Sequence, residues 1–121
     1  MEHKEKARQT LESFLKAWQN KDHALMGQFL QLTWKAENGG KWPLFASSWF
    51  LVNNMKKWRI SEPKRIGQAN YEFPLIISFS RGGRPQKRRI SARIICENGP
   101  YEPGLDGSWG INPVSMLRGL S

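Results

Sequence analysis

Lysine and arginine residues gather in two parts of this sequence, and they are its most evident binding groups. One cluster contains Lys56, Lys57, Arg59, Lys64 and Arg65, and the other contains Arg81, Arg84, Lys87, Arg88, Arg89 and Arg93. The net charge of +9 draws the chain toward polyanions. We expect a polyanion-binding surface at Arg59, Arg88, Arg89 and Arg93, with nucleic acid as a candidate partner through counterion release. The alternatives are a solvated face, or a hairpin whose charges discourage edge pairing.

The aromatic residues suggest a second kind of site. Six tryptophans in 121 residues supply large apolar surfaces that suit either a core or a pocket for an apolar ligand. We expect a ligand pocket lined by Trp18, Trp34, Trp49, Tyr71 and Trp109. The competing interpretation is that most of them, Trp18 above all, belong to the core.

Groups suited to acid–base or metal chemistry are scarce. His3 and His23 are expected at the surface, Asp22 as a helix cap, and Asp106 in a turn. Glu72, Glu97 and Glu102 could line the mouth of a pocket, and Cys96 has no neighbouring histidine in the sequence to activate it. We therefore predict no catalytic residue, no metal ligand and no cofactor, and expect a protein that is not an enzyme.

Helical periodicity dominates the first half of the chain. Ala7, Leu11, Phe14, Leu15 and Trp18 form one apolar stripe, which predicts a helix ending near Asn20 and Lys21. Asp22 is placed to cap a second helix that continues to Thr33. After Pro43, residues 44–54 are expected to be helical, with a buried strand as the alternative.

The period changes to two from Trp58 onward. Alternating residues predict strands at 58–61, 71–79 and 90–96, with a hairpin turn at 81–85 and a short last strand at 108–112. The fold class is therefore α+β, with N-terminal helices packed on an antiparallel sheet. We expect a single domain over residues 1–121.

Two segments resemble the nuclear transport factor 2-like superfamily. They are residues 11–18, followed directly by Asn20-Lys21-Asp22, and the terminal turn and strand at 106–111. The resemblance extends over roughly residues 6–112 and implies a cone-shaped, cystatin-like fold with a curved sheet, an apolar pocket at its open end and a homodimer formed through the convex face. Pro74, Gly67 and Gly110 are candidates for the bends of such a sheet. No position matches the catalytic motif of an enzyme branch of this superfamily.

The functional prediction is a non-enzymatic binding or scaffolding domain with an apolar pocket between the first helix and the sheet. The alternatives are a basic module that binds nucleic acid or another polyanion, and an isomerase- or dehydratase-like enzyme of the same superfamily. The charged N-terminal segment and the single cysteine predict a cytoplasmic protein, and no apolar run predicts a membrane span.

Overall fold

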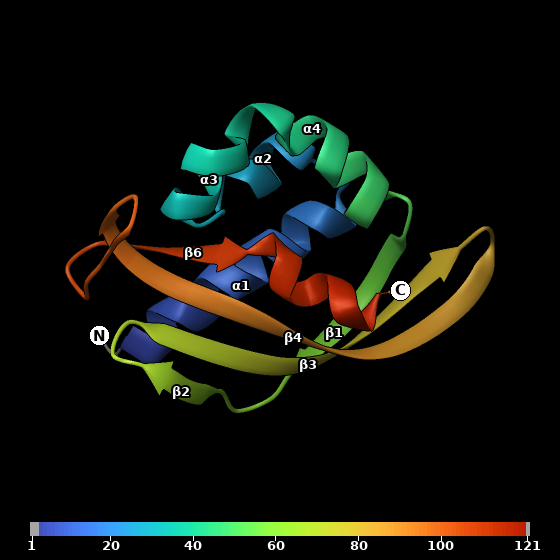
Figure 1. The fold of residues 1–121 in the computed structure, drawn as a ribbon. Helices are drawn as coiled ribbons and strands as arrows, with labels where there is room; N and C mark the ends of the chain where they lie inside the picture. Colours follow the sequence, from blue (N-terminus) through green and yellow to red (C-terminus); the bar gives the residue numbers. More distant parts are fainter. Residues whose placement is uncertain (1–2, 121) are drawn as a thin grey trace.

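The computed structural model describes residues 3–120, in which helices cover one face of an antiparallel sheet (Figure 1). The long helix α1 (His3–Gln19) crosses the sheet. Its apolar stripe is buried, with Leu11, Phe14 and Trp18 at most 1% exposed. Lys21 takes a left-handed φ of 58°, and the Asp22 carboxylate accepts from the Leu25 amide at 3.1 Å. The predicted helix end and the predicted cap are therefore confirmed.

A second helical layer follows α1 and lies beside it (Figure 1). It consists of α2 (His23–Gln28), α3 (Leu32–Asn38), the 3-10 turn η1 (Gly39–Lys41), α4 (Trp42–Phe45) and the π-helical turn η2 (Ala46–Leu51). The expected helix at 44–54 thus corresponds to α4 and η2. Aromatic side chains hold this layer to α1, because Phe50 packs edge-on against both Phe14 and Trp18 at 5.6 and 5.0 Å between ring centroids.

The sheet is built on two long strands, β3 (Asn70–Arg81) and β4 (Arg84–Gly99). They pair without a break from Asn70↔Ile95 to Arg81↔Arg84. The turn at Gly82 and Gly83 has φ values of +57° and +79°, which glycine accepts without a steric penalty. β1 (Asn54–Ile60) and β2 (Lys64–Gly67) pair with β3, and β5 (Glu102–Pro103) and β6 (Ser108–Asn112) pair with β4.

Three elements were not anticipated: β2, β5 and the 3-10 helix η3 (Pro113–Gly119). Asn112 caps η3 by accepting from the Val114 amide at 3.0 Å. η3 packs so tightly on β4 that a Cβ added at Gly119 would lie 2.2 Å from Cγ2 of Ile90. Of the candidate bends, Gly67 lies at a register shift, whereas Pro74 sits in the unbroken β3–β4 ladder. Within residues 3–120, no helix is long and apolar enough to cross a membrane.

Candidate functional site

The face of the sheet turned away from α1, here called the outer face, collects the basic residues. β3 alternates strictly, so Phe73, Leu75, Ile77 and Phe79 are buried toward the helices. The residues between them point outward and are short or uncharged from Pro74 to Ser80. β3 therefore forms an uncharged central strip on the outer face.

Basic residues flank this strip on both sides because of the strand register. Two successive rows cross the three strands: Lys57, Ser78 and Lys87 form one, and Arg59, Ile76 and Arg89 form the next. Neighbouring strands lie about 4.8 Å apart, so the basic residues of β1 and those of β4 form two lines about 10 Å from each other. Arg59 and Arg89 therefore share a sheet face.

Arg93 extends the β4 line by one more outward position beyond Ser91. It pairs in register with Glu72, and its Nε lies 3.8 Å from Oε2 of that carboxylate. Among the described outward positions paired across β1, β3 and β4, Glu72 is the single acidic residue. The outer face is thus strongly basic, and Glu72 is the one acidic group on it that would compete with a bound anion for Arg93.

Arg88 does not belong to this surface. Its register partner is Ile77, which is buried toward the helices, so Arg88 points to the inner side of the hairpin. Its guanidinium carbon lies 5.9 Å from the centre of the Phe79 ring, and Nη1 donates to Gln86 at 2.8 Å. Arg88 therefore lies on the side opposite Arg89 and Arg93, since adjacent strand residues face opposite sides.

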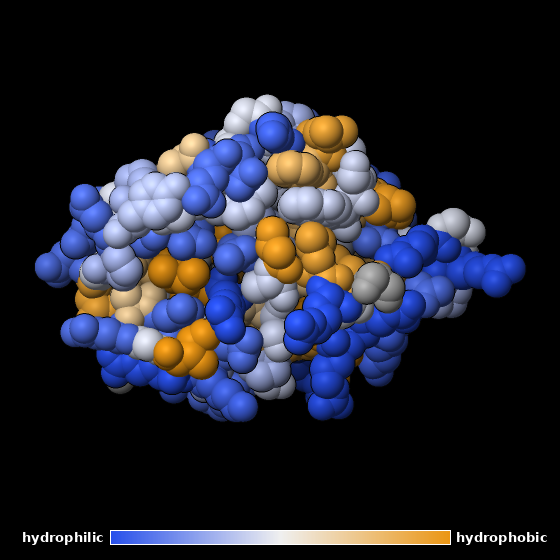
Figure 2. Space-filling view, in the orientation of Figure 1, coloured by the Kyte–Doolittle hydropathy of each residue, from blue (hydrophilic) through white to orange (hydrophobic). Residues whose placement is uncertain are grey.

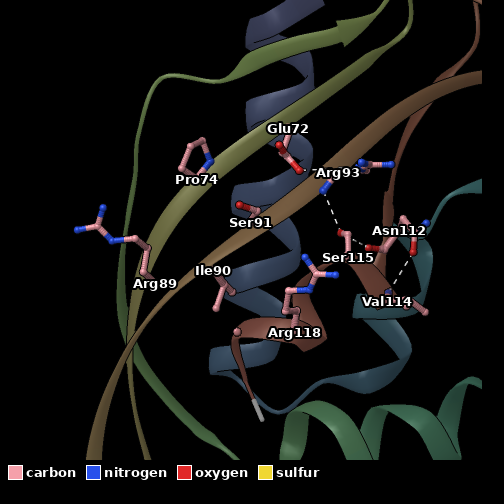
Figure 3. Close-up of a pocket in the computed structure, with 11 residues that line it drawn as sticks. Glu72, Pro74, Arg89, Ile90, Ser91, Arg93, Asn112, Val114, Ser115 and Arg118 are labelled. Atoms are coloured by element: carbon pink, nitrogen blue, oxygen red, sulfur yellow. Dashed lines mark hydrogen bonds and ion pairs between the residues drawn. The ribbon is translucent and has the colours of Figure 1, made fainter.

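Three hollows lie along the outer face. The η3 hollow, of about 590 Å³, is bounded by β3, β4 and η3 and includes Glu72, Pro74, Ser91, Arg93 and Arg118 (Figure 3). The β1 hollow, of about 260 Å³, lies around Ile76 and Ser78, between Arg59 and Lys87. The loop hollow, of about 480 Å³, lies at Asn70 and Ile95 under the loop that follows β5.

The five aromatic residues predicted to line a ligand pocket fall into two separate groups. Trp18 and Trp34 are buried, and Trp49 stacks on Phe45 with ring centroids 4.3 Å apart. Tyr71 and Trp109 meet elsewhere, 5.7 Å apart. None of the three hollows described above is lined by any of these five residues. The predicted apolar pocket stays a prediction.

The buried carboxylate of Glu97 serves the packing of α3. It is 3% exposed and accepts from the Thr33 amide at 2.9 Å, from the Thr33 hydroxyl, and from Nε2 of Gln31 at 3.2 Å. Glu97 thus does not line a pocket mouth, whereas Glu72 lines the η3 hollow and Glu102 is exposed. Within residues 3–120, no group of three or more His, Cys, Asp or Glu side chains could hold a metal ion.

Within residues 3–120, the pKa values of Cys96 and Tyr101 are shifted, and both groups lie away from the basic rows. Burial raises the pKa of the Cys96 thiol, which faces the helices beside Ile94. The hydrogen bond to the Glu37 carboxylate, 2.8 Å from the hydroxyl, raises the pKa of Tyr101. Tyr101 is exposed, so its phenol remains solvated.

Comparison with known proteins shows which fold this is. The structure matches an NTF-2-like protein of unknown function from Shewanella oneidensis MR-1 with a TM-score of 0.61 and 12% identity, covering 88% of this chain and 92% of that one. It also matches a proposed polyketide cyclase from Xanthomonas campestris pv. campestris with a TM-score of 0.53 and 9% identity, covering 99% and 100%. The chain has the NTF-2-like fold. No family model matches the sequence, and no curated protein matches it either.

Sequence reasoning missed the residues that η3 brings to the outer face. Ser115 and Arg118 line the η3 hollow together with Ser91 of β4. Ser91 could have been found, because it has the same strand parity as Arg89 and Arg93. No periodic signal indicated that the segment after Pro113 would turn back along β4.

Proposed function

We propose that this protein is a non-enzymatic binding domain whose outer sheet face binds a polyanion. The observation that supports it is the register that sets Lys57 and Arg59 of β1 opposite Lys87 and Arg89 of β4. Between them runs a strip of Ser78, Ile76 and Pro74 without a charge. A polyanion lying on this strip would have lysine and arginine side chains on both sides, and its binding would release counterions.

The helical side of the molecule has a different character. Figure 2 shows hydrophilic residues over the projecting β3–β4 hairpin, and hydrophobic residues over α4, around η3 and over the left part of the sheet. The interior beneath the helices is occupied by Phe14, Trp18, Phe50 and Phe73, each at most 1% exposed. This favours the outer face over the space between α1 and the sheet as the binding surface.

An enzyme resembling the Xanthomonas protein is a weaker candidate. Such chemistry requires a proton-transferring group within hydrogen-bond reach of a bound substrate. Glu97, the buried carboxylate of the described chain, instead spends its acceptor capacity on Gln31 and Thr33.

The predicted homodimer would use the same face. A two-fold axis there would bring a surface of Lys57, Arg59, Lys87 and Arg89 against its own copy, because a two-fold interface is self-complementary. Like charges would oppose this contact, so added salt should favour the dimer by screening, whereas it should weaken polyanion binding. The two uses of the face therefore respond to salt in opposite directions.

The experiment is a titration of a fluorescent heparin fragment at low salt, followed by anisotropy. We expect the double variant Arg59→Glu/Arg89→Glu to bind at least about tenfold more weakly than the parent. The matched control is Lys21→Glu/Lys41→Glu, which changes the net charge equally at two exposed lysines of the helical side. This control should retain most of the affinity.

Equal losses in both variants would mean that only net charge matters, and would reject the outer face as a site. Absence of binding by the parent at low salt would reject the function itself. Circular dichroism of each variant would confirm that the fold is kept.

A further inference from the structure

The η3 hollow has the largest volume of the three hollows described above. Its volume of about 590 Å³ falls in the range of about 300–1,000 Å³ that small-molecule sites occupy. One wall is the outward side of β3 and β4, and the other is η3, which runs beside β4 where β6 has ended.

The polar groups of this hollow lie together on one side. In Figure 3 the Arg118 side chain extends toward Ser115 and Arg93, while Arg89 points away from the hollow. The Ser115 hydroxyl is held in place, because it donates to the Asn112 carbonyl at 2.5 Å and accepts from the Arg93 amide at 2.9 Å. The two guanidinium groups of Arg93 and Arg118 can donate to a phosphate group, whereas the Ser115 hydroxyl has already given its proton to Asn112.

Apolar side chains also contribute to the lining. Pro74 of β3 lies at one side of the hollow and Val114 of η3, which is 49% exposed, lies beside Asn112 at the other (Figure 3). A lining that combines guanidinium groups with exposed apolar side chains suits a ligand that carries an anionic group and a flat ring. A sulfated sugar chain or an acidic peptide offers the charge without such a ring.

The η3 hollow also lies in line with the other two. Along β3 they follow in the order Ser78 and Ile76, then Pro74 and Glu72, then Asn70. Successive outward residues of a strand are about 6.8 Å apart, so the nine residues from Asn70 to Ser78, with eight steps between them, span about 27 Å. A chain of several units could occupy the whole line.

We propose that the η3 hollow receives one nucleotide of a single-stranded nucleic acid whose backbone lies along the outer face. Its phosphate lies at Arg93 and Arg118, and its base lies against Val114 of η3. The strand must be single because a base in a duplex is paired and stacked, and extruding it costs free energy. This proposal rests on the proposed function and names its ligand.

The experiment compares three probes at one low salt concentration: a labelled 12-nucleotide single strand of mixed sequence, its duplex, and a heparin fragment of matched charge. We expect the parent to bind the single strand at least about tenfold more tightly than either of the others. Ser91→Phe fills the hollow without changing the charge, and should remove this preference while heparin affinity stays within about twofold. Ser80→Phe, on the same face of β3 but outside the three hollows, is the matched control and should bind all three probes like the parent.

A second variant guards against a folding defect in Ser91→Phe. Val114→Ser changes an exposed apolar side chain in the lining of the hollow and should weaken single-strand binding by about threefold, while Val52→Ser, at an equally exposed valine of the helical side, should not. Heparin binding as tight as single-strand binding would overturn the nucleotide site and leave the polyanion function standing. Failure of the parent to bind any of the three probes would overturn both.

Discussion

Glu72 and Arg93 face each other across β3 and β4, with Oε2 of the carboxylate 3.8 Å from Nε of the guanidinium. Both side chains are partly solvated, so the pair itself contributes little to stability. Its consequence lies in binding, because Glu72 is the acidic neighbour that any anion approaching Arg93 must displace.

Replacing Glu72 with Gln should therefore strengthen polyanion binding. A partly exposed ion pair is worth about 0.2–1 kcal/mol, so the gain should be at most about fivefold in affinity. Anisotropy with the heparin fragment at low salt would measure it. Glu12→Gln, on α1, removes the same charge far from the outer face and should have a smaller effect. Unchanged or weaker binding by Glu72→Gln would show that Arg93 does not contact the ligand.

Trp18 should be a main determinant of stability. Its Nε1 donates to the carbonyls of Phe50 and Asn53 at 2.9 and 3.1 Å, which ties α1 to the end of η2 and the start of β1. Trp18→Phe keeps most of the apolar volume but leaves both carbonyls without this donor, which should cost about 1–3 kcal/mol of the free energy of unfolding. Urea denaturation would measure the change, and a loss below about 0.5 kcal/mol would contradict this role.

The order of helices and strands could be predicted from periodicity alone. The stripe from Leu11 to Trp18 and the alternation from Tyr71 to Phe79 each match a buried face, because packing in both cases follows the backbone period. The Asp22 cap was predictable too, since its chemistry is local. These features depend on neighbours close in the sequence.

The site could be predicted only in part. Arg59, Arg88 and Arg89 were expected on one binding surface; the strand register sets Arg59 and Arg89 on one face and Arg88 on the other. The η3 hollow was not foreseen, since it depends on a contact between Gly119 and Ile90, 29 positions apart in the sequence. Gly119 allows this close packing because it has no side chain, and a single glycine gives no periodic pattern in the sequence.

Glu97 should anchor α3 rather than bind a ligand. Its carboxylate satisfies the Thr33 amide and hydroxyl at the start of that helix. Glu97→Gln should cost about 1–3 kcal/mol, because an amide cannot accept from all of these donors at once. Hydrogen exchange should then speed up at the first turn of α3 more than in β3. Protection at α3 equal to that of the parent would contradict the anchoring role.

The buried thiol of Cys96 should make stability fall at alkaline pH. Its pKa in the folded state lies above the ordinary value of 9.0, so the folded protein keeps its proton where the unfolded chain has lost it. The stability contribution is complete below about pH 9 and is lost as the pH rises through the folded pKa. Urea midpoints of the parent and of Cys96→Ala between pH 7 and pH 10.5 would test this, since the effect of Tyr101 is common to both.

For Cys96→Ala the midpoint should fall less steeply above about pH 9 than for the parent. Parallel curves for the two proteins would show that the thiol ionises in the folded state as easily as in the unfolded chain. Below about pH 8 the difference between them should not depend on pH.

The dependence of polyanion affinity on salt tests the account most directly. If Lys57, Arg59, Lys87, Arg89 and Arg93 meet three to five phosphates of a single strand, the slope of log Kobs against log salt concentration should be about −2 to −3.5. Arg59→Glu/Arg89→Glu should reduce the magnitude of this slope by at least about one. A parent slope near zero, or one that the double variant leaves unchanged, would contradict the outer face as the binding surface.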